Sequence, residues 1–233
     1  MKKPIRGGGA IMFIIKESPA KPDQELIALL KDVEPATAGH FRHHGFVDPA
    51  ICPVIKGAKV VGPAVTVKTP GADSTVVHKV MEIAEPGDVI VIDRCGDRLH
   101  ACWGGMVTLA AHLKHLAGGI IDGPATDIDE IEELGFPVYC RGMSAITTKL
   151  MGFGGEINTA VQCGGVSVEP GDLIVADRNG IVVLKPWEAR QVAEKALAMQ
   201  AAEKNVEAEL RSGKSLSSIS RANAIILESE KTG

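Results

Sequence analysis

The residues best suited to chemistry lie between positions 101 and 127. Gly104 and Gly105 precede a segment with helical spacing, and backbone N–H groups at the start of a helix attract anions. Asp127 lies in a polar turn after a short apolar strand, where a carboxylate can hold a hard cation such as Mg²⁺ or Mn²⁺. A small oxo-acid substrate requires an anion site beside a cation site. The pattern therefore indicates a site for such a substrate.

A helix and a strand must bring these two loops together. Apolar residues in the segment 106–116 have the spacing of one buried helical face: Val107, Leu109, Ala110, Leu113 and Leu116. We expect Gly118-Gly119 to end this helix, because glycine tolerates the left-handed conformation of a C-cap. Ile120-Ile121 then begins the strand, and residues 122–127 form the polar turn.

Each of these residues also has a purely structural interpretation. Two consecutive glycines are common in tight turns, and Asp-Gly is a common turn pair. Asp127 is also positioned to cap a helix predicted over Ile128–Leu134. The clustering of these residues in one stretch favours the functional interpretation, and both remain open from the sequence.

A second candidate group lies in the segment 37–48, which contains three of the seven histidines: His40, His43 and His44. Arg42 lies among them and carries a positive charge at any pH. The segment is either a solvated loop or a metal or substrate site, and it could also reach the site of a neighbouring subunit.

Composition limits the function classes. The chain has 233 residues, of which 45% are hydrophobic and 23% charged, so it can form a globular core. A formal net charge of −4 and an aromatic content of 3% argue against nucleic-acid binding and against binding to membrane surfaces. We therefore expect neither nucleic acid nor membrane as a partner.

Five cysteines are present, and none forms a Cys-x-x-Cys pair. This pattern predicts reduced, buried thiols rather than a zinc site or a disulfide framework. Neither a signal-peptide pattern nor an apolar run long enough to span a bilayer is visible. The sequence therefore predicts a soluble, cytoplasmic protein.

The chain divides into three predicted parts. Residues 1–22 form an N-terminal arm, in which 11–15 is a strand or a docking segment. Residues 23–211 form a single domain that begins with a helix capped by Asp23 and ends with a long helix over 187–211. Residues 212–233 form a polar tail with one apolar patch at 224–227.

Further elements follow from local patterns. Predicted strands are 59–69, Val89–Asp93, 137–140, Leu173–Asp177 and 181–184, and predicted helices are 74–84 and Ile128–Leu134. Pro-Gly-Asp turns precede two of the strands, at Pro86 and Pro170, and Asn179-Gly180 is a strong hairpin signal.

Several motifs come in a recognisable order. They are VVGPAVTV at 60–67, PGDVIVID at 86–93, the glycine turn, helix and Asp-Gly turn of 103–127, GFPVYCRG at 135–142, and GGVSVEPGDLIVADRNGIVVL at 164–184. Over roughly residues 23–200 the chain resembles the family that contains 4-hydroxy-4-methyl-2-oxoglutarate/4-carboxy-4-hydroxy-2-oxoadipate aldolases and RraA-type regulators of ribonuclease E.

This resemblance implies a fold and an activity. The implied fold is a single-domain α/β sandwich with a mixed central sheet, RraA-like and similar to swivelling domains, assembled as a homo-trimer or hexamer. The implied activity is that of a class II pyruvate aldolase, in which a divalent metal and an arginine bind the oxo-acid. The same site decarboxylates oxaloacetate, since both reactions develop negative charge on the C2 oxygen.

The family's catalytic pattern is an Asp, then twenty residues, then Arg-Asp. Here it falls on Gly105, residues 106–125, and Thr126-Asp127. The resemblance makes Asp127 the metal ligand and a catalytic residue, and it places Thr126 where the substrate-binding arginine belongs. The backbone of Gly104, Gly105, Met106 and Val107 matches the loop that holds the substrate carboxylate. Losing the arginine removes a bidentate, permanently charged contact.

Two functions follow from the resemblance. The first is a divergent metal-dependent lyase that cleaves a 4-hydroxy-2-oxo acid to release pyruvate, decarboxylates oxaloacetate, or does both. The alternative is a non-catalytic RraA-type regulator or oxo-acid-binding protein. In the lyase, the missing positive charge would come from another residue, with His40, Arg42, His43, His44, His100, Arg94 and Arg98 as candidates.

Overall fold

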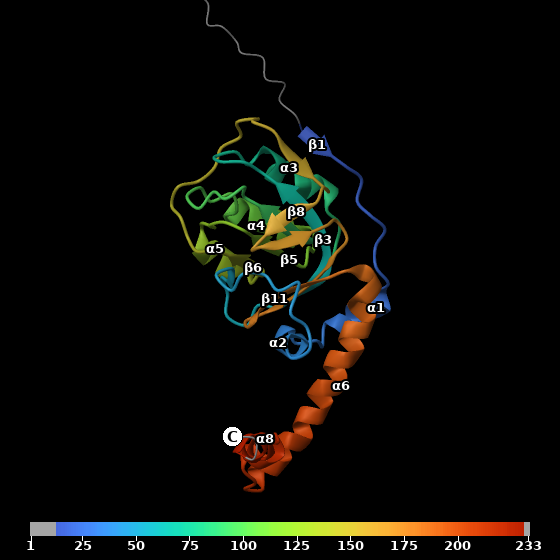
Figure 1. Cartoon of the computed structure of the whole chain (residues 1–233). Coiled ribbons are helices and arrows are strands. Elements are labelled where there is room, and N and C mark those ends of the chain that lie inside the picture. Colours follow the sequence, from blue (N-terminus) through green and yellow to red (C-terminus); the bar gives the residue numbers. More distant parts are fainter. Residues whose placement is uncertain (1–12, 231–233) are drawn as a thin grey trace, which may run out of the picture.

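A mixed nine-stranded sheet lies at the centre of the protein in the computed structural model, which describes residues 13–230 (Figure 1). The strands are β1 Phe13–Ile15, β2 Cys52–Pro53, β3 Val60–Lys68, β4 Val89–Asp93, β5 Gly118–Ile121, β6 Val138–Cys140, β7 Gly155–Ile157, β8 Val161–Cys163, β9 Val166–Val168, β10 Leu173–Asp177 and β11 Gly180–Leu184. The helices are α1 Gln24–Leu30, α2 Pro35–Gly39, α3 Thr75–Ile83, α4 Gly105–Leu113, α5 Ile128–Leu134, α6 Pro186–Arg211, α7 Leu216–Ile219 and α8 Ala222–Glu230. Strands β8 and β9 form a separate two-stranded sheet.

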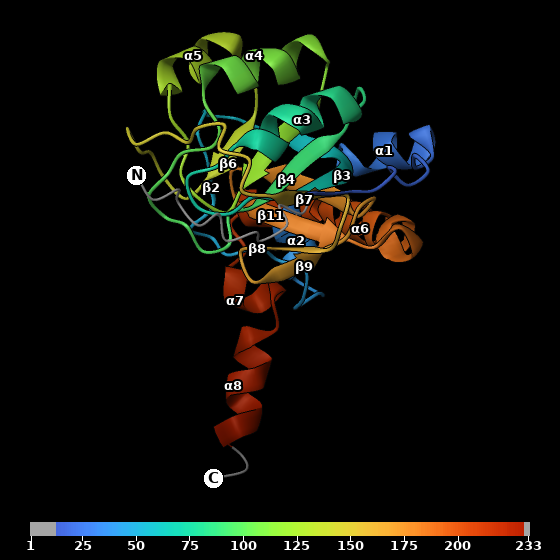
Figure 2. The ribbon, with the colours of Figure 1, turned by 90° about the horizontal axis from the view of Figure 1, so that it is seen from above.

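Four neighbouring strands of the sheet, β3, β4, β5 and β6, run parallel. A helix connects each of them to the next, and Figure 2 shows these helices, α3, α4 and α5, together on one face of the sheet. The apolar run of β4 is buried on both faces, as expected for a central parallel strand. The carboxyl ends of the four strands therefore lie at one edge, where the loops that follow them meet.

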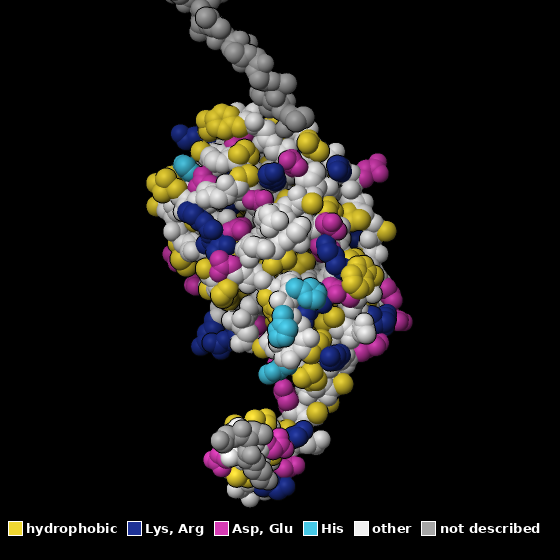
Figure 3. Space-filling model, viewed as in Figure 1, with side chains coloured by type: hydrophobic (Ala, Val, Ile, Leu, Met, Phe, Trp, Pro, Cys, Tyr) yellow, Lys and Arg dark blue, Asp and Glu magenta, His cyan; other side chains and the backbone are white. Residues whose placement is uncertain are grey.

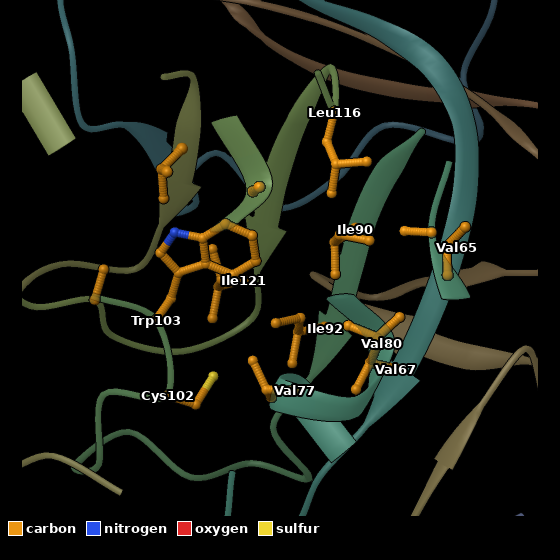
Figure 4. Close-up of a cluster of buried hydrophobic side chains, with 14 of the residues drawn as sticks. Val65, Val67, Val77, Val80, Ile90, Ile92, Cys102, Trp103, Leu116 and Ile121 are labelled. Atoms are coloured by element: carbon orange, nitrogen blue, oxygen red, sulfur yellow. The ribbon is translucent and has the colours of Figure 1, made fainter. Parts of the chain in front are cut away.

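The core between this sheet face and the three helices is built from aliphatic side chains around one indole (Figure 4). Val77 and Val80 of α3 pack with Ile90 and Ile92 of β4. Trp103 is fully buried, and its Nε1 donates a hydrogen bond to Thr108 Oγ1 at 2.9 Å. This hydrogen bond fixes the turn before α4 to the first turn of the helix.

The predicted buried face of α4 is wrong in part. The residues of α4 that are fully buried are small, namely Gly105, Thr108 and Ala111, whereas Leu113 is 68% exposed. Val107, Leu109 and Ala110 are only partly buried. Small side chains let the helix lie close to the sheet. A prediction from the spacing of large apolar residues does not identify these small buried residues.

The predicted helix end at Gly118-Gly119 is also wrong. Helix α4 ends at Leu113, His115 adopts the left-handed conformation with φ 57°, and both glycines belong to β5. A Cβ on Gly118 would lie 2.5 Å from Val60 Cγ2, and a Cβ on Gly119 would lie 3.0 Å from the Trp103 ring. These glycines are needed for close packing rather than for a turn.

Other predicted elements are confirmed. The Asp23 side chain accepts the Glu25 N–H and caps α1, and Gly135 ends α5 in the left-handed conformation. Strands β10 and β11 form the predicted hairpin, in which Gly180 pairs with Asp177.

The two ends of the chain extend beyond the sheet. In the segment 11–15, predicted as a strand or a docking segment, Phe13–Ile15 is a strand that pairs in parallel with β7, whereas residues 11 and 12 lie outside the described part. At the other end, α6 leads to the short helices α7 and α8, which project from the body (Figures 1 and 2). The apolar side chains of α8 at Ile225, Ile226 and Leu227 are exposed. Within residues 13–230, no helix is both long enough and apolar enough to cross a bilayer.

Candidate active site

A cavity of about 310 Å³ opens at the edge of the sheet where the four parallel strands end. Its walls come from the segments that follow these strands: Ser74 and His78 after β3, Ala101, Cys102, Gly104, Met106 and Val107 after β4, Thr126 and Asp127 after β5, and Thr147 and Thr148 after β6. Isolated bridges between Ala101 and Thr147 and between Trp103 and Ala125 join these segments. The fold thus brings Gly104, Met106, Val107, Thr126 and Asp127 together.

The Asp127 carboxylate is held at the start of α4. Its Oδ2 accepts the Gly105 N–H at 2.9 Å, and its Oδ1 accepts the Thr126 hydroxyl at 3.2 Å. The Asp127 backbone is left-handed, with φ 55°, a conformation that aspartate tolerates better than most residues. Asp127 precedes α5, but its side chain makes no capping hydrogen bond there. The carboxylate therefore caps α4, and the simple interpretation that it caps the following helix is wrong.

Two further backbone amides border the cavity at the same helix end. Thr108 N–H is the first amide of α4 to bond back along the chain, to Gly104 O at 2.9 Å. The amides of Met106 and Val107 precede it, so they have no carbonyl acceptor within the helix. Hence two N–H donors remain available to an anion beside the Asp127 carboxylate.

Gly104 and Gly105 allow the carboxylate to approach this closely. A Cβ on Gly104 would overlap Asp127 Oδ2. A Cβ on Gly105 would lie 3.3 Å from Glu130 Cβ, so Glu130 borders the space that a side chain at position 105 would enter. The absence of a side chain at these positions thus shapes the site directly.

Among residues 13–230, those that line the cavity include Asp127 as the sole carboxylate and no Lys or Arg. The remaining polar groups are the His78 imidazole, the Cys102 thiol and the hydroxyls of Ser74, Thr126, Thr147 and Thr148. Burial raises the pKa of the Cys102 thiol to about 11, so this group stays neutral near pH 7. From the described lining, an anionic substrate in this cavity therefore meets one negative charge and no fixed positive charge.

Sequence reasoning missed five of the polar residues in this lining, namely Ser74, His78, Cys102, Thr147 and Thr148. Ser74 and His78 are one turn apart in the segment that follows β3, and the rule that ligands bind at the carboxyl ends of parallel strands would have selected them. Thr147 and Thr148 lie in the long irregular segment between β6 and β7, for which the sequence carries no comparable signal.

The predicted contribution of residues 40–44 to this cavity is not found within one chain. His40, His43 and His44 are exposed, and histidines gather on the surface over α2 (Figure 3). Arg42, His43 and His44 line a different cavity together with residues of α6. Residues 42–44 therefore lie beside α6 and not at the Asp127 cavity.

Arg42 has a structural partner. Its Nη1 and Nη2 donate to Glu188 Oε2 and Oε1 at 2.9 and 2.6 Å, and its Nε donates to His44 O at 2.8 Å. Both side chains of the pair are buried. Arg42 is therefore already neutralised and is not a free cation for a substrate.

The other suggested cations organise the loop after β4. Arg94 is fully buried and donates to the carbonyls of Thr69, Gly71 and His100. Arg98 forms an ion pair with Asp122 at 3.4 Å, and His100 Nδ1 lies 2.8 Å from Asp97 Oδ2. Burial acts to raise the pKa of Asp97, but hydrogen bonds from the backbone and ring of His100 and from the Leu99 N–H lower it to about 2. None of these cations lines the Asp127 cavity.

We expect Arg42→Met to lower the free energy of unfolding by about 3–5 kcal/mol, because Glu188 would be left buried without its cation. The Arg42 hydrogen bonds lower the pKa of Glu188 against the opposing effect of burial. The stability that this carboxylate provides is thus present above the ordinary glutamate pKa of about 4.3 and is lost as the pH falls through the lowered value.

Urea denaturation at a series of pH values checks this prediction. Arg98→Met is the matched control, because the Arg98 side chain is 54% exposed and its loss is expected to cost under about 1 kcal/mol. Equal losses in the two variants would show that the Arg42–Glu188 pair has no special structural role.

Comparisons with known proteins complete the description of the site. A family model described as RraA-like, Aldolase/RraA, matches residues 29–183. A protein of Halalkalibacterium halodurans named "Putative 4-hydroxy-4-methyl-2-oxoglutarate aldolase" is 42% identical over 65% of this chain and 71% of its own length. An uncharacterized protein of Methanocaldococcus jannaschii is 36% identical over 71% of this chain and 80% of its own length.

Among solved structures, the chain is similar to Streptomyces coelicolor RraAS2, described as an unusual member of the RNase ES inhibitor RraA protein family. The TM-score is 0.73 at 29% identity, over 81% of this chain and 98% of that one. The region matched by the family model contains every residue that lines the Asp127 cavity.

Proposed function

Because the chain belongs to the RraA-like family, described as Aldolase/RraA, we propose that the Asp127 cavity is the active site of a divergent, divalent-metal-dependent lyase. Its substrate is a 4-hydroxy-2-oxo acid, which it cleaves to release pyruvate. The observation that carries the proposal is the Asp127 carboxylate, held by Gly105 N–H beside the free amides of Met106 and Val107. The name of the Halalkalibacterium halodurans relative supports the reaction class.

The donor set fits a small hard cation. Mg²⁺ in proteins is commonly bound by one or two carboxylates, and waters and substrate oxygens complete its octahedral shell. Among residues 13–230 there is no cluster of three or more His, Cys, Asp or Glu side chains that could enclose a metal, so Asp127 would be the protein's ligand. A cation there would also offset the repulsion between Asp127 and an anionic substrate. When bound, such a cation supplies Lewis-acid stabilisation of negative charge on the C2 oxygen.

The chain's own residues bind and orient the substrate. The Met106 and Val107 amides donate to the substrate carboxylate at the positive end of α4. The Thr126 hydroxyl donates to Asp127 Oδ1 and, with Gly105 N–H, fixes the orientation of the carboxylate.

A proton acceptor is also needed, and among the described residues that line the cavity His78 carries the one imidazole. We assign to His78 the acceptance of the proton from the substrate's 4-hydroxyl oxygen as the C3–C4 bond breaks. Return of that proton to C3 gives the methyl group of pyruvate, and C4 leaves as a carbonyl. Decarboxylation of oxaloacetate would use the same carboxylate site.

Pyruvate release from a panel of 4-hydroxy-2-oxo acids and from oxaloacetate, with and without Mg²⁺, tests the proposed function. We expect Mg²⁺-dependent release from at least one substrate. If the wild-type protein and the Thr126→Arg variant were both inert on every substrate, the lyase proposal would be rejected.

We expect Thr126→Arg to raise the rate of pyruvate release by about 10- to 100-fold, because a hydrogen bond to a charged group contributes about 1.5–3 kcal/mol. The variant restores a bidentate cation at the position where the family has one. Thr126→Gln is the control, since it adds length and hydrogen-bonding groups without charge. An equal gain with glutamine would show that charge is not the missing factor.

A second candidate function is binding of an oxo-acid without turnover. The described part of the cavity lining favours it, because it contains no Lys or Arg that would stabilise the reaction. Metal-dependent binding of an oxo-acid by a protein that releases no pyruvate from any substrate would identify this function.

We further propose that the protein is a homo-trimer or hexamer. Beside the cavity, the segment after β6 exposes several large apolar side chains, among them Met143, Leu150 and Phe153, which a partner copy would cover. Light scattering checks the assembly: the proposal predicts a mass three or six times that of the chain. A mass near 24.5 kDa would contradict it.

A further inference from the structure

Two cysteines lie directly opposite each other at one edge of the sheet. Strand β2 pairs antiparallel with β6, and the register places Cys52 against Cys140. Val54 N–H donates to Val138 O at 2.8 Å, which continues the same register. Directly opposed residues of antiparallel strands point to the same face, with Cα atoms about 4.5–5.5 Å apart. Disulfides span Cα separations of about 4.4–6.8 Å, so the backbone already has the spacing that a disulfide requires.

The two thiols differ in accessibility, and the prediction that the cysteines are buried is wrong for Cys52 and Cys95. Cys52 is exposed, whereas Cys140 is 3% exposed and lies beside it at a surface cavity of about 190 Å³. Their Sγ atoms donate to the carbonyls of Pro49 and Gly142 at 3.1 and 3.2 Å. Each thiol is free and makes one weak hydrogen bond, so a side-chain rotation can bring the two sulfur atoms together for oxidation.

We propose that Cys52 and Cys140 form a reversible intramolecular disulfide, and that the pair is a modification site for low-molecular-weight disulfides such as oxidised glutathione. Nothing in this proposal depends on the function assigned to the Asp127 cavity.

The exchange proceeds in two steps. The Cys52 thiolate attacks one sulfur of oxidised glutathione, forming a mixed disulfide and releasing one glutathione thiolate. The Cys140 thiolate then attacks Cys52 Sγ, forming the Cys52–Cys140 bond and releasing the second glutathione. Two protein thiols are oxidised, one glutathione disulfide is reduced to two thiols, and the two protein protons pass to solvent or to the glutathione thiolates. Burial raises the pKa of the Cys140 thiol, and exposed Cys52 is accordingly the attacking residue.

The disulfide would join β2 to the end of β6, next to residues that hydrogen-bond to the segment after β5. Just after Cys140, Gly142 O accepts the Ala125 N–H at 3.0 Å, and Ser144 N–H donates to Ala125 O at 2.9 Å. Cross-linking residues 52 and 140 closes a long loop in the unfolded chain, so oxidation should raise the melting temperature.

Oxidation of the native full-length protein with oxidised glutathione tests the proposal, using intact-mass spectrometry, thiol titration after denaturation and peptide mapping. We expect the five thiols of the wild type to fall to three, with a cross-linked peptide joining Cys52 to Cys140 and no retained glutathione. Dithiothreitol should restore all five and reverse the rise in melting temperature. Cys95→Ser, which removes an exposed cysteine elsewhere, should retain this cross-link.

Two variants separate the roles of the pair. Cys140→Ala should hold glutathione on Cys52 as a stable mixed disulfide, and Cys52→Ser should leave Cys140 reduced. Because Cys52 is exposed, Cys52→Ser keeps the test decisive even if the buried substitution prevents folding. A wild-type protein that retains glutathione on Cys52, or an intramolecular disulfide that persists in Cys52→Ser, would overturn the proposal.

Discussion

Replacing Asp127 by asparagine is expected to remove the Mg²⁺-dependent rise in melting temperature while the protein remains folded. The amide oxygen of asparagine can still accept the Gly105 N–H, so α4 keeps its cap, whereas the negative charge that holds a cation is lost. A ligand at 100 times its Kd stabilises a protein by about 2.7 kcal/mol, and the variant should lose that entire increment. Pyruvate release should fall to background in the same variant.

Thermal melts of the wild type and variants, with and without Mg²⁺, measure this effect. Asp129→Asn is the matched control, because Asp129 is an exposed acid in the first turn of α5 and should not alter the Mg²⁺ response. Asp127→Ala removes the cap as well and should cost about a further 1 kcal/mol at every Mg²⁺ concentration. An unchanged Mg²⁺ response in Asp127→Asn would remove Asp127 as the metal ligand.

The His78→Gln variant is expected to lower turnover by about 100-fold or more, the range that general-base catalysis contributes. Glutamine keeps much of the size and polarity of the side chain but cannot accept the proton. Loss of an interaction made in the transition state lowers kcat and leaves KM nearly unchanged. A merely structural role for His78 would change KM or stability instead.

A matched control separates His78 from other histidines. His112→Gln, at the exposed last turn of α4, should keep the rate of the wild type. An equal loss of rate in His112→Gln would show that the effect is not specific to His78.

Much of the candidate site could be predicted because its signals are local. Gly104 and Asp127 flank one helix–strand unit, and the start of a helix and the end of a parallel strand are both readable from a single stretch of sequence. His78, Thr147 and Thr148 reach the same cavity from segments far apart along the chain. Only the strand order β3-β4-β5-β6 brings them together, and that order is a property of tertiary structure.

The errors also have physical causes. Residues 40–44 contain histidines and an arginine that could bind a substrate or a metal. However, Arg42 pairs with Glu188 of α6, which lies far away in the sequence, and this pair holds the segment against α6. The predicted buried face of α4 rests on large apolar residues, whereas the structure buries the small side chains of Thr108 and Ala111. Packing between segments that are far apart in the sequence decides which residues form ion pairs and how closely a helix approaches the sheet. The spacing of residues along the sequence does not encode this packing.

Calorimetric titration with oxalate tests most directly whether the Asp127 cavity binds a divalent cation and an oxo-acid together. Oxalate is a planar dianion that resembles the enolate of pyruvate, and its binding does not require turnover. We expect oxalate to bind the wild-type protein in the presence of Mn²⁺ and not in its absence, and we expect Asp127→Asn to abolish this binding while Asp129→Asn retains it. Oxalate binding that is equally strong without metal, or that is unaffected in Asp127→Asn, would contradict the assignment of this cavity.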